Sequence, residues 1–139
     1  MFRFSFRLSV VFALCVLALG ANATLGSARS DRAAVSCSGA VSWNTAHRYV
    51  GRTMTVKGRV VGTRYAATTN GSPTFLNLGV DYPSTRRFTV VIWGRDRANF
   101  TVPEQRYRNQ TICARGRVID YYGVEEIFAS SPSQIRVAS

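Results

Sequence analysis

The densest β-pattern of the chain lies in residues 73–94, where two short apolar runs flank an eight-residue connection. The first run reads PTFLNLG and the second FTVVIWG, and both are rich in aromatic and branched side chains. Such runs, each ended by a glycine, predict a β-hairpin. Alternation places Thr89, Val91 and Trp93 on one face of the second strand, but it does not show which face is inside. Trp93 and Phe75 can therefore lie in the core or at the surface.

The stretch before the hairpin also alternates with a period of two. Met54, Val56 and Val60 fall on one side, and polar residues fall between them. Gly58 and Gly62 permit the bulge or coil that a strongly bent strand needs. We therefore predict a long, bent first strand that begins at residue 53.

The remaining apolar patterns complete a small β-protein. Ser42 is suited to cap a short helix over residues 43–49, and residues 96–100 can form one helical turn. Further strands are predicted at 111–118 and 124–129. This order is that of the OB-fold. The predicted fold is all-β: a five-stranded OB-fold barrel with a short N-terminal helix and a short helical insert between strands three and four.

The first residues carry a different pattern. Arg3 and Arg7 precede an apolar run over residues 8–20, and small residues follow it. This pattern is typical of a secretory signal, and the run is short for a membrane span of about 20 residues. We expect a secreted or periplasmic protein with no stable membrane insertion after cleavage, although an uncleaved anchor stays an alternative. The predicted parts are a signal peptide (1–23), a flexible N-terminal segment (24–40) and an OB-fold domain (41–137).

Charge points to an anionic partner. The chain has 18 basic and 7 acidic residues, a net charge of +11, and loss of Arg3 and Arg7 leaves +9. Lys57 is the only lysine, so guanidinium groups supply nearly all of the positive charge. Their planar form suits phosphates and stacking on bases. The alternative is that a basic surface only keeps a small exported protein in solution.

OB domains bind single strands by stacking bases on aromatic side chains of the second and third strands, while basic loops follow the phosphates. On the sheet, the corresponding candidates are Phe75, Asn77, Trp93 and Arg95. In the loops, the candidates are Arg64, Tyr65, Arg86, Arg87, Tyr121 and Tyr122. Tyr121 and Tyr122 cannot both point inward, so at least one should be exposed. Tyr82, beside Pro83, is expected to pack against its own turn.

Catalysis is not indicated by the residue types. There is one histidine, His47, and the acidic residues are scattered, with Glu125 and Glu126 on opposite faces of a strand. We therefore predict no enzyme activity, no metal and no cofactor. A nuclease stays an alternative, because a phosphodiesterase can combine clustered carboxylates with arginines on this type of barrel.

Two cysteines remain after loss of the signal peptide, Cys37 and Cys113. An exported pair in an oxidising compartment favours a disulfide. The sequence does not show whether the two side chains approach each other.

Several sequence blocks resemble a known family. In chain order they are PTFLNLG at 73–79, FTVVIWG with the Asp-Arg pair at 88–97, Pro103-Glu104, TIC at 111–113 and SPSQI at 131–135. Together they are similar to small bacterial OB-fold modules that occur alone on exported proteins or beside thermonuclease-like and other extracellular nuclease domains. The resemblance covers about residues 41–137. It implies an OB barrel, nucleic-acid binding and an extracellular nuclease as a candidate partner.

One feature departs from that family. Its members often carry a cysteine on the first strand that faces the cysteine of the TIC block, whereas this chain has Lys57 there. Cys37 lies upstream instead, so pairing with Cys113 would differ from the family pattern.

Two functional hypotheses follow. The first is an exported, monomeric, non-catalytic protein that binds single-stranded DNA or RNA with little sequence preference. The second is an envelope or surface OB-fold module that binds an anionic glycan, a small ligand or a protein.

Overall fold

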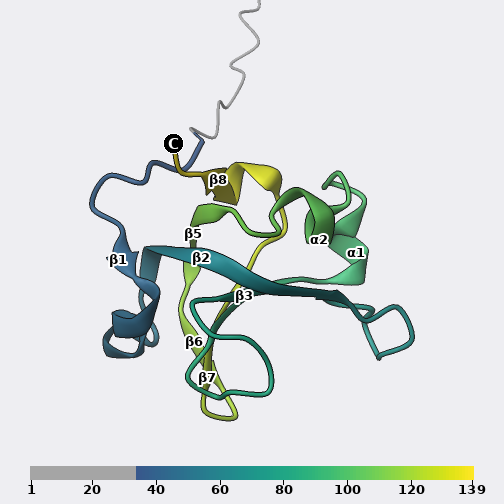
Figure 1. Cartoon of the computed structure of the whole chain (residues 1–139), viewed down its shortest axis with the longest axis horizontal. Coiled ribbons are helices and arrows are strands. Elements are labelled where there is room, and N and C mark those ends of the chain that lie inside the picture. The colour runs from purple at the N-terminus through teal and green to yellow at the C-terminus, as the bar shows by residue number, and fades with distance from the viewer. Residues whose placement is uncertain (1–33) are drawn as a thin grey trace, which may run out of the picture. The chain divides into compact units, whose positions relative to one another are not determined.

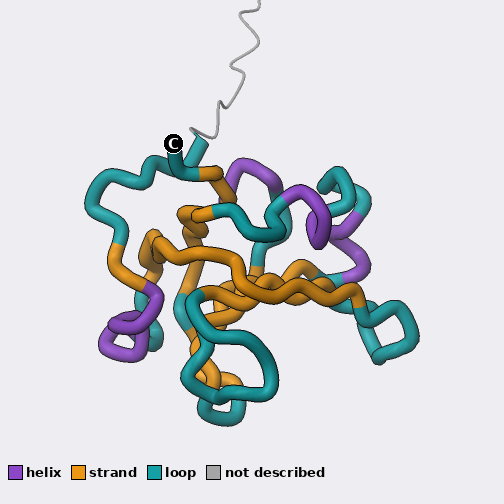
Figure 2. The backbone as a smooth tube through the Cα atoms, in the orientation of Figure 1, coloured by secondary structure: helices purple, strands orange, loops and turns teal. Residues whose placement is uncertain are grey.

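The structure is a computed structural model that describes residues 34–139, so the predicted signal peptide lies outside the described residues. The described part is all-β, with four short helical segments (Figures 1 and 2). Within it, no helix has the length and apolar character needed to cross a membrane. The elements in chain order are β1 (Val41–Ser42), η1 (Trp43–Tyr49), β2 (Thr53–Tyr65), β3 (Thr74–Leu78), β4 (Phe88–Ile92), α1 (Gly94–Arg97), α2 (Pro103–Arg106), β5 (Thr111–Arg117), β6 (Ile119–Tyr121), β7 (Val124–Phe128), η2 (Pro132–Gln134) and β8 (Ile135–Val137).

All of these strands join one sheet. Its path runs β6, β7, β4, β3, β2, β5 and β8, and β1 pairs with β2 beside this path. β2 lies antiparallel to both β3 and β5, whereas β4 and β7 run parallel. A long first strand between the second and fourth, with the third and last strands parallel, is the connectivity of an OB barrel. The predicted fold class is confirmed.

The strand count differs from the predicted five because one strand is interrupted and two are additional. A single residue, Val118, separates β5 from β6, and the chain there changes its partner from β2 to β7. β5 and β6 together thus take the place of the predicted fourth strand. β1 and β8 are short strands at the edges of the barrel.

The helical parts are shorter or tighter than predicted. η1 covers the predicted N-terminal helix but is a 3₁₀ helix, and the Ser42 side chain makes no capping hydrogen bond. The insert between β4 and β5 contains two separate α-helical turns, α1 and α2, in place of the single predicted turn. Figure 1 shows both turns at one end of the molecule, above the extended β2–β3 hairpin.

The long strand β2 bends where the sequence predicted. Its pairing with β3 shifts register between Val60 and Gly62. The carboxylate of Asp81 occupies the space that a Cβ atom at position 62 would fill. A residue with a side chain would therefore displace Asp81, which explains why glycine suits this position.

One side chain links β5 to β7 where these strands are not paired. The Gln134 amide nitrogen donates hydrogen bonds to the carbonyl oxygens of Arg115 and Phe128, at 3.0 and 3.3 Å. Its Oε1 accepts from the backbone N–H groups of Ser130 and Ser131, at 2.9 and 3.1 Å. The SPSQI block therefore holds the seam of the barrel together.

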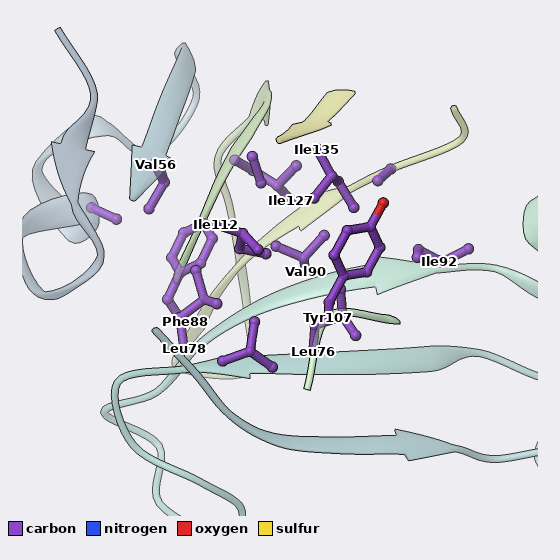
Figure 3. Packing of buried hydrophobic residues seen from close by; sticks show 14 of the residues in the cluster. Val56, Leu76, Leu78, Phe88, Val90, Ile92, Tyr107, Ile112, Ile127 and Ile135 are labelled. Atoms are coloured by element: carbon purple, nitrogen blue, oxygen red, sulfur yellow. The ribbon is translucent and has the colours of Figure 1, made fainter. Parts of the chain in front are cut away.

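The hydrophobic core fills the inside of the barrel (Figure 3). Alternate residues of the hairpin strands, including Leu76, Val90 and Ile92, are fully buried there. Ile112 of β5 and Ile127 of β7 close the core from the opposite side. Truncation of one such side chain to alanine typically costs about 2–5 kcal/mol.

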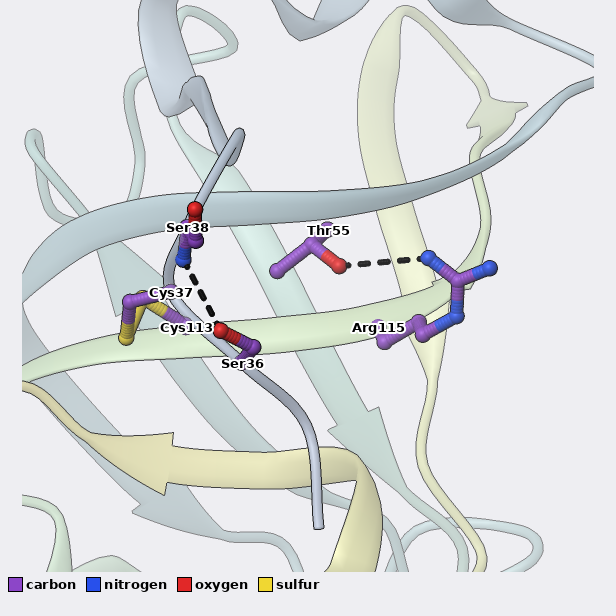
Figure 4. Close-up of a disulfide and its surroundings, with 6 residues drawn as sticks. All are labelled: Ser36, Cys37, Ser38, Thr55, Cys113 and Arg115. Carbon is purple, nitrogen blue, oxygen red and sulfur yellow. Dashed lines mark hydrogen bonds between the residues drawn. A yellow bond between two sulfur atoms is a disulfide. The ribbon is translucent and has the colours of Figure 1, made fainter. Parts of the chain in front are cut away.

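A disulfide ties the N-terminal segment to the barrel. Cys37 and Cys113 are bonded, with Cα atoms 5.5 Å apart (Figure 4). Lys57 is paired with Cys113 across β2 and β5, as the resemblance of sequence blocks implied. The sequence left open whether the two cysteines approach each other, and the structure shows that they do. The partner of Cys113 comes from the segment before β1.

Candidate nucleic-acid interface

Outward-facing residues of β2, β3, β4 and β7 form two rows across the sheet. Residues that alternate with them, such as Leu76, Val90 and Ile127, are fully buried in the core. The strand register gives the first row as Arg64, Phe75, Val91 and Phe128, and the second row as Gly62, Asn77, Thr89 and Glu126. The sequence did not show which face of the second hairpin strand is inside. In the structure, the face that carries Thr89 and Val91 is the outer one.

Four aromatic residues surround a hollow of about 510 Å³ on this face, which we call the aromatic hollow. Its aromatic lining residues are Phe75, Trp93, Tyr121 and Phe128. Trp93 is half-buried, and its ring meets the Phe128 ring edge to face at 5.6 Å. Such pairs add about 0.5–1.5 kcal/mol beyond their buried area, so they hold both rings in place.

Tyrosine rings extend the aromatic surface beyond the hollow. Tyr121 and Tyr122 are 53% and 89% exposed, and their rings meet edge to face at 4.8 Å. The expectation that at least one of them is exposed is confirmed, and both are. Phe128 is 41% exposed and adds a further ring to this surface.

A second, more polar hollow of about 360 Å³ adjoins the first, and Phe75 lines both. We call it the polar hollow. Its lining residues are Thr63, Arg64, Phe75, Asn77, Asp81, Tyr82 and Arg87. Two guanidinium groups and two aromatic rings therefore line the same hollow.

Hydrogen bonds fix the floor of the polar hollow. Thr89 Oγ1 donates to Asn77 Oδ1 at 3.1 Å, and Asn77 Nδ2 donates to Asp81 Oδ1 at 2.8 Å. Asn77 is only 5% exposed. Its amide already has partners on both sides, so it shapes the hollow more than it offers a free contact to a ligand.

The turn beside the polar hollow differs from the prediction for Tyr82. Tyr82 does not pack down onto its turn but is 69% exposed. The Arg87 guanidinium lies 5.5 Å from the centre of its ring and also donates to the Ser84 carbonyl at 2.6 Å. Tyr82 is held over Arg87 and remains open to solvent.

One acidic residue lies on the floor of the aromatic hollow. Glu126 is 6% exposed, and among residues 34–139 no hydrogen bond or ion pair reaches its carboxylate. Burial raises the pKa of Glu126 to about 7, and the positive charge of Arg87 lowers that pKa by a smaller amount. A carboxylic acid at this position changes its charge near neutral pH.

Three of the predicted residues lie outside the shared face. Tyr65 stacks on Arg97, whose guanidinium carbon is 3.8 Å from the ring centre. Arg97 also makes two hydrogen bonds to Glu104, at 2.8 and 2.9 Å, so this Tyr65 surface belongs to a structural cluster. Arg86 lines a different hollow together with His47, and Tyr122 lines neither hollow.

The remaining predicted residues do come together. The aromatic hollow contains Phe75, Trp93, Arg95 and Tyr121, and the polar hollow contains Arg64, Phe75, Asn77 and Arg87. Sequence reasoning missed Phe128, Glu126, Asp81 and Tyr82. The first two could have been found from the OB order itself, because its parallel third and last strands place alternate residues of β7 beside those of β4.

Metal-ligating side chains do not gather in groups of three or more within the described part of the chain. The acidic residues on the shared face, Asp81 and Glu126, line different hollows.

Comparisons with known proteins leave the family open. No family model matches the chain, and no curated protein matches it. Among solved structures, an aspartyl-tRNA synthetase from Leishmania major Friedlin aligns with a TM-score of 0.44 and 14% identity, over 70% of this chain and 20% of that one. The OBody AM1L10, bound to hen egg-white lysozyme, aligns with a TM-score of 0.42 and 16% identity, over 66% and 83%. The chain therefore spans about a fifth of the synthetase, and the resemblance to exported bacterial modules stays a prediction.

Proposed function

We propose that this protein binds single-stranded nucleic acid on the outer face of β2, β3, β4 and β7. The observation that carries the proposal is that the aromatic and polar hollows adjoin at Phe75. Rings and guanidinium groups thus share one continuous surface, as base stacking next to a phosphate backbone requires.

The guanidinium groups have a suitable arrangement around the rings. Arg64 and Arg87 line the polar hollow, and Arg95 lines the aromatic hollow beside Trp93. The Arg95 side chain is 80% exposed, with only a 3.5 Å contact to Asp96. Groups with this freedom can follow phosphates along a flexible strand.

Single strands suit this surface better than a duplex does. The rings of Phe75, Trp93 and Phe128 lie within or at the rim of a hollow, where only an unpaired base can reach their faces. Stacking is worth about 1–3 kcal/mol per base and tolerates every base. We propose a non-catalytic role in an exported protein, in keeping with the basic charge and the N-terminal sequence pattern.

The test is binding of fluorescein-labelled dT12 and rU12, followed by fluorescence anisotropy at 50 mM salt. Phe128→Ala and Tyr121→Ala should each weaken binding by roughly fivefold to a hundredfold, because each removes a stacking surface. Tyr49→Ala is the matched control, since this half-buried ring lies on η1 and lines neither hollow. Thermal unfolding of all variants verifies the fold.

Failure of the wild-type protein to bind either oligonucleotide at 50 mM salt would contradict the proposal. The alternative would then be an OB-fold module for an anionic glycan, a small ligand or a protein. Equal loss of affinity in Tyr49→Ala and Phe128→Ala would likewise show that the oligonucleotide is not bound specifically by the outer face.

A further inference from the structure

Glu126 is poorly suited to contact phosphate, although it lies on the β7 side of the proposed binding face. Its register partners there are Thr89 on β4 and Ile119 on β6, neither of which carries a charge. The residue as a whole is 94% buried, and no described group donates a hydrogen bond to its carboxylate, whose oxygens still reach solvent. Burial of an ionised group without a partner is costly, so the carboxylate favours N–H donors brought by a ligand.

The surroundings of Glu126 restrict the kind of donor. Arg87 and Arg95, together with the net charge of +11, repel a cationic ligand. Four of the residues that line the hollow carry aromatic rings, which accept a flat, uncharged group. A nucleobase that offers N–H groups along one edge fits both restrictions.

Only one standard base offers two adjacent donors on its Watson–Crick edge. Guanine presents N1–H and N2–H side by side, and the two oxygens of a carboxylate can accept both. Adenine and cytosine place an acceptor nitrogen beside their amino group, and thymine has one N–H between two carbonyl oxygens. Each of these would set a lone pair against the carboxylate.

We propose that the aromatic hollow is a guanine subsite in which the Glu126 carboxylate accepts hydrogen bonds from N1–H and N2–H. The base stacks against the ring lining formed by Phe75, Trp93 and Phe128. This inference rests on the proposed nucleic-acid binding and adds a base preference to it. The remaining rings and arginines bind neighbouring nucleotides without regard to sequence.

The preference has a direction with pH. The charged and titratable groups around Glu126 are Arg87 before β4, Arg95 after β4 and Tyr121 on β6. Because burial raises the pKa of Glu126 to about 7, the carboxylate is ionised at pH 8 and mostly protonated at pH 5.5. A protonated carboxyl can no longer accept two hydrogen bonds in this way, so the preference for guanine declines as the pH falls.

The experiment uses 11-mers of thymidine whose central nucleotide is deoxyguanosine, deoxyinosine, deoxyadenosine, deoxycytidine or thymidine. Anisotropy titrations at pH 8 should show guanine bound about tenfold more tightly than thymine. Inosine lacks the N2 amino group and should fall between them. At pH 5.5 the difference between guanine and thymine should shrink to less than about threefold.

Glu126→Gln should lose the guanine preference at pH 8, measured within the variant as the ratio of its affinities for the guanine and thymidine 11-mers. Glu125→Gln is the matched control, because Glu125 is the neighbouring acid and lines a different hollow. It should keep the preference. Circular dichroism of both variants verifies the fold.

The outcomes separate this inference from the proposed function. If the wild type binds all five 11-mers equally, the guanine subsite is wrong and nucleic-acid binding stands. If it binds none of them at low salt, both proposals are wrong. A guanine preference that survives Glu126→Gln, or that is lost equally in Glu125→Gln, would also overturn the subsite.

Discussion

Glu126 shows how one residue can connect stability with binding. Its pKa is raised from 4.5 to about 7 because burial disfavours the charged carboxylate. Between these two values the folded protein holds the proton more tightly than the unfolded chain does. The folded state therefore loses stability relative to the unfolded state as the pH rises through this range.

We predict that Glu126→Gln stabilises the protein, and does so more at alkaline pH. The gain in free energy of unfolding over wild type should be about 2 kcal/mol larger at pH 8 than at pH 5. Urea denaturation at the two pH values measures it. Glu125→Gln should show no comparable pH-dependent gain, and a gain in Glu126→Gln that is equal at both pH values would contradict the burial argument.

Glu104 is an acidic residue whose surroundings differ from those of Glu126, because it is paired with an arginine. Arg97 donates to Glu104 and to Thr74 Oγ1, and these contacts join α1 to α2 and to β3. The hydrogen bond from Arg97 is the largest cause of the lowered pKa of Glu104. This pair contributes stability above the ordinary carboxyl pKa and loses it as the pH falls through the lowered value. Arg97 thus stabilises the fold, whereas the arginines that line the two hollows are placed to contact a ligand.

At the scale of elements, the disulfide attaches the N-terminal segment to the barrel. Cys37 and Cys113 are separated by 76 residues, so their bond restricts a long stretch of the unfolded chain. Val35 is also buried, and its N–H donates to the Ser133 carbonyl at 3.1 Å. The segment before β1 is therefore attached to the η2 end of the barrel as well as to β5.

Cys37→Ser should lower the free energy of unfolding by about 2–4 kcal/mol. Guanidinium denaturation of the variant measures this loss, and Ser36→Ala is the control because it alters the same exposed segment without the bond. Wild type treated with a reductant should unfold at the same denaturant concentration as Cys37→Ser. Equal stability of oxidised and reduced wild type would show that the cross-link does not stabilise the barrel.

The elements themselves were largely predictable from the sequence, and their long-range contacts were not. Period-two patterns and glycines located β2, β3 and β4, because each strand is apolar on its core side. Both faces of β4 are buried, so alternation could not show that Trp93 faces outward. The two-turn insert has no apolar period of its own, and the role of Gln134 depends on carbonyl groups of two distant strands.

The candidate site was predictable for the residues on the hairpin and its connection. Aromatic and basic side chains there lie close together in the chain, so Phe75, Trp93 and Arg87 could be grouped without a structure. Phe128 and Glu126 come from a strand more than 30 residues away. Their place beside β4 follows only once the parallel pairing is known.

For the whole molecule, the question is which arginines contribute to binding, because they are spread over several surfaces. Arg64 and Arg95 border the shared face, whereas Arg117 on β5 and Arg136 on β8 line neither of its hollows. All four are exposed. Net charge alone would make these two pairs equivalent in attracting a polyanion.

Direct binding of phosphate makes the two pairs differ in salt dependence. Each arginine–phosphate interaction that a substitution removes should reduce the slope of log K against log salt concentration by about 0.7 for a single strand. Arg64→Gln/Arg95→Gln should therefore flatten the slope for dT12 by about 1.4, while Arg117→Gln/Arg136→Gln, with the same net charge, should leave it unchanged. Anisotropy titrations between 25 and 200 mM salt measure both slopes. Equal slopes in the two double variants would mean that the basic charge attracts nucleic acid only at long range and that no particular face of the barrel holds it.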